Sequence, residues 1–185
     1  MKEFAEAAYH PGKGVAGYDI LQEFTTKDRV AYKHKHSNRV VMAFRGTNPS
    51  NWRDTSTDLL MGFEFHQHSS RFKNASRDTD RLIRKFGKEN VSVTGHSLGG
   101  SQALYVSHKF GVEAEVYNPF VSRFQRGKTY KHATIHHTKG DWISEGSLTT
   151  KAKEVHVHHR KKAKGLTKVG LPVVNTALSH GLSAV

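Results

Sequence analysis

The segment Thr94-Gly-His-Ser-Leu-Gly-Gly100 places a serine between two glycines in the pattern Gly-x-Ser-x-Gly. The residues Val91-Ser-Val-Thr94 before it predict a strand, and residues 98–110 after it predict a helix that Gly111 ends. A serine at such a strained strand-to-helix turn is typical of a nucleophile, because the turn lifts its hydroxyl above the sheet. The glycines leave room where strand and helix approach closely. We therefore expect Ser97 to attack a carbonyl carbon.

A serine nucleophile needs backbone N–H groups that stabilise the oxyanion formed by its attack. Leu98 directly follows the serine and begins the predicted helix, so its N–H points toward the reacting group. A second donor is expected from the loop after an earlier strand. Arg45-Gly-Thr47 follows the apolar run Val40–Phe44 and fits that position. We expect the N–H groups of Thr47 and Leu98 to form the oxyanion hole.

Three segments together resemble the class 3 lipase family of α/β-hydrolases: Ala43-Phe-Arg-Gly-Thr47, Asp58-Leu59 and Val93–Ala103. That family combines a Phe-Arg-Gly-Ser/Thr loop with a Thr-Gly-His-Ser-Leu-Gly-Gly nucleophile segment. The similarity runs from about Val30 to Ser144 and continues more weakly to the C-terminus. The resemblance implies an α/β-hydrolase fold and activity on acyl esters, and the compact chain is similar to forms encoded by large DNA viruses.

A catalytic serine also needs a base and a carboxylate that orients it, and in this fold the chain order is serine, acid, histidine. Asp141 lies in a loop directly after the predicted strand Ala133–His137, at the strand end where an acid reaches the site. Its surroundings resemble the family's Gly-Asp-Pro segment, with Trp142 in place of proline. We expect Asp141 to orient the base, although an acid in such a loop also caps turns.

Four histidines follow Asp141: His156, His158, His159 and His180. His156 and His158 share one face of a predicted strand, which favours a sheet-surface role for them. His180 lies near the end of the chain, where the resembling family carries its catalytic histidine. We expect His180 to be the base, with His158 as the alternative.

Aromatic residues fill the region that corresponds to the family's lid, residues 62–73. Phe63, Phe65 and Phe72 are candidates for binding the acyl chain, and packing beneath the hairpin is an equally good interpretation. Because the chain is compact for this family, we do not expect a large lid.

The composition narrows the remaining possibilities. The 185 residues include no cysteine, so disulfides, thiol catalysis and cysteine-type zinc sites are excluded. Three His-x-His pairs lack an identified third ligand, and we expect no metal or other cofactor. No apolar run is long enough for a membrane span, and the first residues do not resemble a secretory signal. We therefore expect an intracellular or virion-associated protein.

The net charge is +13, and the basic excess gathers in one block. This block is either a solvated surface or a contact for an anionic membrane, an acidic protein or nucleic acid. No nucleic-acid recognition motif accompanies it. Its basic residues are Lys151, Lys153, Arg160, Lys161, Lys162 and Lys164.

The rest of the pattern predicts one α/β domain over residues 1–185. A short helix (Glu3 to Tyr9) and two paired strands (17–24 and 29–35) come first. Strands at 40–44, 91–94, 112–117, 133–137 and 154–159 then alternate with helices at 77–86 and 98–110. This alternation favours a mostly parallel sheet with helices on both faces, fronted by an antiparallel hairpin.

Two functions from different classes follow. The first is a serine hydrolase that cleaves acyl esters, as a lipase, phospholipase or esterase. The alternative is a catalytically retired lipase-like protein that serves a virion or nucleoprotein assembly through its basic surface. The full set of expected catalytic residues favours the hydrolase.

Overall fold

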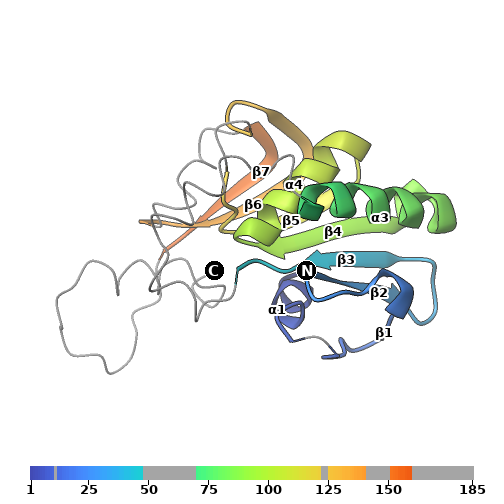
Figure 1. Cartoon of the computed structure of the whole chain (residues 1–185). Helices are drawn as coiled ribbons and strands as arrows, with labels where there is room; N and C mark the ends of the chain where they lie inside the picture. The colour runs from blue at the N-terminus through green and yellow to red at the C-terminus, as the bar shows by residue number, and fades with distance from the viewer. Residues whose placement is uncertain (11, 48–69, 122–124, 141–150, 160–185) are drawn as a thin grey trace, which may run out of the picture.

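The computed structural model describes residues 1–10, 12–47, 70–121, 125–140 and 151–159 (Figure 1). The residues predicted at Asp141, His180, Phe63 and Phe65 lie outside these ranges, as do the basic residues at 160–164.

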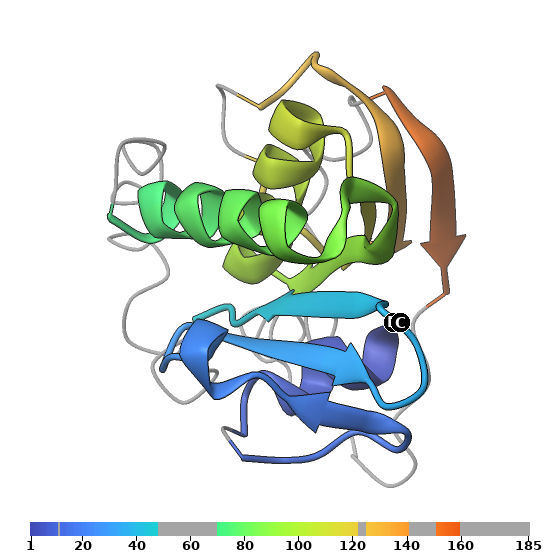
Figure 2. The ribbon, with the colours of Figure 1, turned by 90° about the vertical axis from the view of Figure 1, so that its right-hand side faces the viewer.

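The described residues form a seven-stranded sheet whose strands lie in the order of the sequence. The first three strands pair in antiparallel fashion, and every later neighbour pair is parallel. At one edge of the sheet, β6 and β7 run side by side (Figure 2). The strands are β1 (Tyr18–Ile20), β2 (Arg29–His34), β3 (Val40–Phe44), β4 (Val91–His96), β5 (Glu113–Tyr117), β6 (Thr129–Thr138) and β7 (Lys151–His158).

Helices cover both faces of this sheet. Side chains alternate between the faces of a strand, so Val41 and Ala43 of β3 pack with α1 (Lys2–Ala7). The intervening Met42 and its neighbours face α3 (Ser70–Phe86) and α4 (Leu98–Phe110), which lie beside each other over the parallel strands (Figures 1 and 2). The predicted fold class is confirmed.

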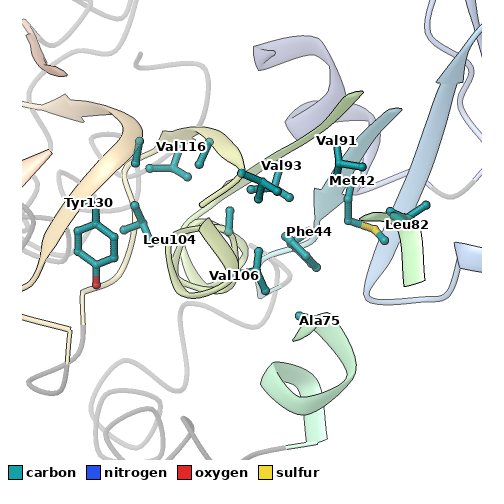
Figure 3. Packing of buried hydrophobic residues seen from close by; sticks show 14 of the residues in the cluster. Met42, Phe44, Ala75, Leu82, Val91, Val93, Leu104, Val106, Val116 and Tyr130 are labelled. Atoms are coloured by element: carbon teal, nitrogen blue, oxygen red, sulfur yellow. The ribbon is translucent and has the colours of Figure 1, made fainter. Parts of the chain in front are cut away.

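The larger core cluster lies between the sheet and the two long helices (Figure 3). Phe44 and Val93 come from the central strands, Leu82 comes from α3, and Leu104 and Val106 come from α4. Burying a side chain of this size stabilises the fold by about 1.5–3 kcal/mol. This layer fixes the position of α4, whose first residue follows Ser97.

Several elements differ from their predictions. The strands predicted from residues 133 and 154 begin earlier, at Thr129 and Lys151. The helix predicted from Arg77 begins at Ser70, because Phe72 and Ala75 in its otherwise polar first turns are buried against the core. Residues Gln22–Phe24, predicted as strand, form the single-turn 3₁₀ helix η1. A second one, η4 (Lys88–Asn90), leads into β4. No helix in the described ranges is long and apolar enough to cross a membrane.

Candidate active site

Ser97 lies between the last residue of β4 and the first residue of α4, in a strained conformation. Its φ of 55° and ψ of −123° belong to the left-handed half of backbone space, which costs a non-glycine residue about 1–3 kcal/mol. Backbone hydrogen bonds hold it there. Its N–H donates to the carbonyl oxygen of Tyr117 at 3.1 Å, and its carbonyl oxygen accepts from Ser101 at 3.1 Å and Phe120 at 3.2 Å. The strained turn predicted at this serine is confirmed.

The glycines around Ser97 lie where no other residue fits. A Cβ atom on Gly99 would lie 2.8 Å from the carbonyl carbon of Phe44 and would overlap its oxygen. A Cβ atom on Gly95 would lie 2.8 Å from the backbone nitrogen of Gly100. The close approach of helix and strand predicted from these glycines is therefore present, and it presses the start of α4 against the carboxyl end of β3.

The loop after β3 lies directly beside the serine. An ideal Cβ atom on Gly46 would be 3.4 Å from Cβ of Ser97 and 2.7 Å from the carbonyl oxygen of His96. Thr47, half-buried, follows Gly46, and Leu98 is buried at the start of α4. The first N–H groups of a helix lack intrahelical acceptors and carry its positive dipole end. The structure thus brings the two segments of the predicted oxyanion hole together.

Arg71, at the start of α3, holds the loop after β3 through a hydrogen bond to the loop backbone. Arg71 donates a 2.7 Å hydrogen bond from its guanidinium to the carbonyl oxygen of Arg45 and lies 3.5 Å from a carboxylate oxygen of Asp28. The backbone N–H of Arg45 donates in turn to the carbonyl oxygen of Asp28 at 2.9 Å. Burial lowers the pKa of Arg71 below its ordinary value. The sequence carries no signal for this contact, because the two segments belong to distant parts of the chain.

Tyr9, just beyond α1, contacts the site from the opposite face of the sheet. Its hydroxyl lies 2.9 Å from Nδ1 of His96, the residue before the nucleophile. The sequence predicts Tyr9 only as the end of a short helix, so this contact is a second one that local patterns miss.

The carboxyl ends of the parallel strands meet at the edge where Ser97 lies. Asn118, with a φ of 41°, ties the strands together at this edge. Its N–H donates to the carbonyl oxygen of His136 at 2.7 Å, and its side-chain oxygen accepts from the N–H of Thr138 at 2.8 Å. Asp141 follows Thr138 by three residues in the sequence. The end of β6 is therefore fastened to the turn that holds Ser97.

His158, the alternative base, is part of a polar chain across the last three strands. Its Nε2 lies 3.0 Å from Nδ1 of His136, and Nε2 of His136 lies 3.1 Å from Oε1 of Glu115. The hydroxyl of Tyr117 donates to the same carboxylate, and its ring stacks on His136 with centroids 4.8 Å apart. The hydrogen bond from His136, and secondarily that from Tyr117, lowers the pKa of Glu115 to about 2 despite partial burial. Burial and the hydrogen bond to Glu115 raise the pKa of Tyr117.

The sequence does not single out this polar chain. The register that pairs Tyr117 with His136, and Thr138 with His158, brings its members together. Alternating polar residues in neighbouring predicted strands are the only signal that could have suggested it.

Of the three aromatic residues predicted to bind the acyl chain, Phe72 lies within the described residues. Its side chain is 3% exposed. Its ring packs edge-to-face against Tyr105 of α4, with centroids 5.4 Å apart. Phe72 therefore contributes to the contact between the two long helices.

The described part of the basic block lies on the edge strand β7. Lys151 and Lys153 are exposed, and Lys153 lies 3.4 Å from a carboxylate oxygen of Glu113. Val155 and Val157 on the same strand are 40% and 51% exposed. This edge thus offers cations and apolar side chains to solvent.

A cavity of about 650 Å³ lies at the amino-terminal ends of the parallel strands β3, β4 and β5. Arg39, Val91 and Glu113 are among the residues that line it. Because Ser97 follows the other end of β4, this cavity does not belong to the candidate active site.

Known proteins support the same fold. Two crystal structures of EstE5, one titled EstE5-PMSF and one soaked with p-nitrophenyl butyrate, are each 10% identical over 85% of this chain and 80% of theirs, with TM-scores of 0.52 and 0.53. Lipase II from Rhizopus niveus is 16% identical over 80% of this chain and 73% of its own, with a TM-score of 0.47. No curated protein sequence matches the chain. The EstE5 likeness shows that the chain has the α/β-hydrolase fold.

A family model also matches the sequence. This model, described as a phospholipase-like, Tle-like phospholipase domain, covers residues 15–121. That range is more than half of the chain and includes both the Gly46 loop and Ser97. The class 3 lipase resemblance and the viral source stay predictions from the sequence. The chain belongs to the Tle-like phospholipase domain family.

Proposed function

We propose that this protein is a serine hydrolase that cleaves a carboxylic ester of a phospholipid or a related acyl lipid. One observation carries the proposal: Ser97 lies in a strained turn at the start of α4, with the Gly46 loop packed directly against it. Strain of this kind persists only where the surrounding structure enforces it, and a strained strand-to-helix turn is typical of a serine nucleophile. Membership of a phospholipase-like family supports the substrate class.

In the first half of the reaction, His180 accepts the proton of the Ser97 hydroxyl while its oxygen attacks the ester carbonyl carbon. The electron pair of the carbonyl double bond moves onto oxygen, and the N–H groups of Thr47 and Leu98 stabilise that charge. When the carbonyl re-forms, the ester C–O bond breaks. The alcohol portion of the lipid then leaves with the proton that His180 returns.

In the second half, water replaces the alcohol. His180 accepts a proton from water, the hydroxide oxygen attacks the acyl-enzyme carbonyl, and the bond to Ser97 breaks. The serine regains its proton and the fatty acid is released. Asp141 holds the imidazole in the required tautomer throughout.

The choice between the two candidate bases favours His180. A base in this role directs Nε2 to the serine hydroxyl. In His158 that nitrogen lies 3.0 Å from Nδ1 of His136 instead, within a chain of contacts that continues to Glu115. We therefore assign His158 to the packing of β7 against β6 and retain His180 as the base.

We also propose that the substrate is taken from an anionic lipid surface. The chain carries a net charge of +13, and Lys151 and Lys153 are exposed on β7. A well-placed lysine contributes about 1 kcal/mol to binding at such a surface.

Labelling with a fluorophosphonate probe tests the nucleophile. We expect the wild-type protein to be labelled on the peptide that contains Ser97, and S97A to remain unlabelled. S92A is the matched control, because Ser92 lies at the other end of β4 and makes only a 3.4 Å contact to the carbonyl oxygen of Val40. Equal labelling of S97A and the wild type would refute the assignment. An unlabelled wild-type protein would favour the retired-enzyme alternative.

Substrate and base are tested on lipid. Wild-type protein incubated with phosphatidylglycerol in mixed micelles should release fatty acid and lysophospholipid, detected by mass spectrometry. H180A should lose at least about 1,000-fold in kcat, the scale of losing a triad member. H158Q should stay within about tenfold of wild type, since it perturbs strand packing alone. The reverse order of the two variants would identify His158 as the base.

A further inference from the structure

The Tyr9 side chain joins two segments of the site that are otherwise far apart in the sequence. Its hydroxyl lies 2.9 Å from Nδ1 of His96, a residue 87 positions away, next to the nucleophile. The same hydroxyl lies directly against Gly46 in the loop after β3, since an ideal Cβ atom on Gly46 would overlap it. The guanidinium of Arg45 lies 5.8 Å from the centre of the Tyr9 ring. One phenol therefore contacts both the loop and the turn.

The protonation state of Tyr9 follows from its surroundings. The backbone of Gly46 lowers the pKa of Tyr9, as a backbone N–H close to a phenol oxygen does. Burial has the larger, opposite effect and raises the pKa of Tyr9 to about 12. The hydroxyl therefore keeps its proton at neutral pH, and in the Nε2–H tautomer of His96 it donates to Nδ1. A protonated phenol of this kind serves as a fixed link and does not act as a general base.

The residues that precede Tyr9 pack into the core. Phe4, Ala7 and Ala8 of the preceding helix region are buried against β2 and β3. These contacts anchor α1 to the sheet face opposite α3 and α4, so the position of Tyr9 is set by the core. On its other side the Tyr9 hydroxyl is in direct contact with the loop, because a Cβ atom on Gly46 would overlap it.

We propose that Tyr9 is a positioning residue of the oxyanion hole. Its hydroxyl ties the Gly46 loop to His96, so that the N–H groups of Thr47 and Leu98 converge on one oxyanion. This inference rests on the proposed ester hydrolysis and adds to it the residue that sets the geometry of the hole. Oxyanion donors stabilise the transition state only when they are held near 3 Å from the developing charge, so a loosened loop lowers kcat.

Tyr9→Phe is the direct test, because it removes the hydroxyl and keeps the ring. With a soluble p-nitrophenyl ester we expect kcat to fall at least about tenfold, below the roughly 100-fold loss of a whole donor, and KM to change less than about twofold. Tyr32→Phe is the matched control. Tyr32 is a buried tyrosine that packs with Phe4, and its hydroxyl hydrogen-bonds only to the carbonyl oxygen of Lys13, at 3.3 Å. We expect it to keep the wild-type kcat.

A second readout separates positioning of the oxyanion hole from a general structural role. Sulfur is a weaker hydrogen-bond acceptor than oxygen, so the rate ratio between an ester and its thionoester reports on the oxyanion donors. We expect this ratio to be smaller in Y9F than in the wild type. An unchanged kcat, or a fall in kcat with an unchanged ratio, would overturn the proposal.

Substitutions of His96 test the same link if Y9F folds poorly. In H96N the side-chain amide oxygen takes the place of Nδ1 and can still accept from Tyr9, whereas H96L removes the acceptor. We expect the ester-to-thionoester rate ratio of H96L to match that of Y9F, and the ratio of H96N to match that of the wild type. Equal ratios in H96L and H96N would overturn the proposal. Comparison of the wild type with S97A on the same ester comes first. Equal rates there would refute the hydrolase function itself, independently of Tyr9.

Discussion

Gly99, in the first turn of α4, lies against the carbonyl group of Phe44 at the end of β3, with no room between them for a side chain. In G99A the new methyl group must push the helix away from the sheet, and overpacking of this kind costs about 1–3 kcal/mol. We expect urea unfolding to show that loss. Gly14 is the control, since no atom lies within 4 Å of its ideal Cβ and G14A should change stability by less than about 0.5 kcal/mol. Equal effects of the two variants would contradict the packing argument.

The strained conformation of Ser97 predicts that a glycine at this position makes the protein more stable and inactive. Glycine adopts a φ of 55° readily, so S97G relieves strain of about 1–3 kcal/mol and pays about 0.5–1 kcal/mol of backbone entropy. We expect S97G to be about 1 kcal/mol more stable than the wild type and inactive on esters. S92G, a regular position in the same strand, should instead be destabilised. Thermal unfolding of both variants checks the sign, and a destabilised S97G would show that the turn is unstrained.

The ion pair between Arg29 of β2 and Asp78 of α3 is almost fully buried. Removing the carboxylate in D78A leaves a buried guanidinium without its partner, which costs about 3–5 kcal/mol. D80A is the control, because the Asp80–Arg84 pair lies on the exposed side of the same helix and contributes less than about 0.5 kcal/mol. Chemical unfolding of the two variants measures the difference. A D78A variant as stable as D80A would show that Asp78 does not hold α3 to the sheet.

The Glu115 carboxylate makes the stability of the fold depend on acid pH. Its pKa falls from 4.5 to about 2 on folding, chiefly through the hydrogen bond from His136. A carboxyl group whose pKa is lowered by folding stabilises the folded state at pH values above its unfolded-state pKa. This contribution is lost as the pH falls from 4.5 toward 2.

We therefore expect E115Q to be less stable than the wild type at pH 7, by about 1 kcal/mol once solvent screening is allowed for. The difference should shrink toward zero as pH falls through this window, as followed by urea unfolding at a series of pH values. E154Q, which changes the exposed Glu154–His156 pair, is the control with a small effect. A difference that stays constant down to pH 2 would contradict the assigned role of Glu115.

The exposed lysines of β7 predict binding to anionic lipid. Neutralising two lysines in K151Q/K153Q removes about 2 kcal/mol of attraction, or roughly 30-fold in affinity, for phosphatidylglycerol vesicles at low salt. K35Q/K85Q removes the same charge from exposed sites elsewhere and is the control. Vesicle sedimentation compares the two, with phosphatidylcholine vesicles as the neutral reference. Equal losses would show that net charge alone, without a specific surface on β7, determines binding.

The nucleophile turn could be predicted because its sequence signals are local. The strand, the Gly-x-Ser-x-Gly pattern and the helix occupy residues 91–110, and the predicted helix end at Gly111 is confirmed by its left-handed φ of 66°. The parallel sheet followed from the alternation of strands and helices in the same way. By contrast, the first two turns of α3 are polar, and only burial of Phe72 and Ala75 against the core makes them part of the helix.

Asp141 and His180 stay predictions of the sequence, together with the choice of Thr47 as an oxyanion donor. The supports of the site came from the tertiary structure alone. Tyr9 reaches His96 across 87 residues, Arg71 reaches the loop at Arg45, and Glu115, His136 and His158 meet through the register of three strands. Short patterns determine turns and helix ends because those depend on neighbouring residues, whereas contacts between distant segments depend on how the whole core packs.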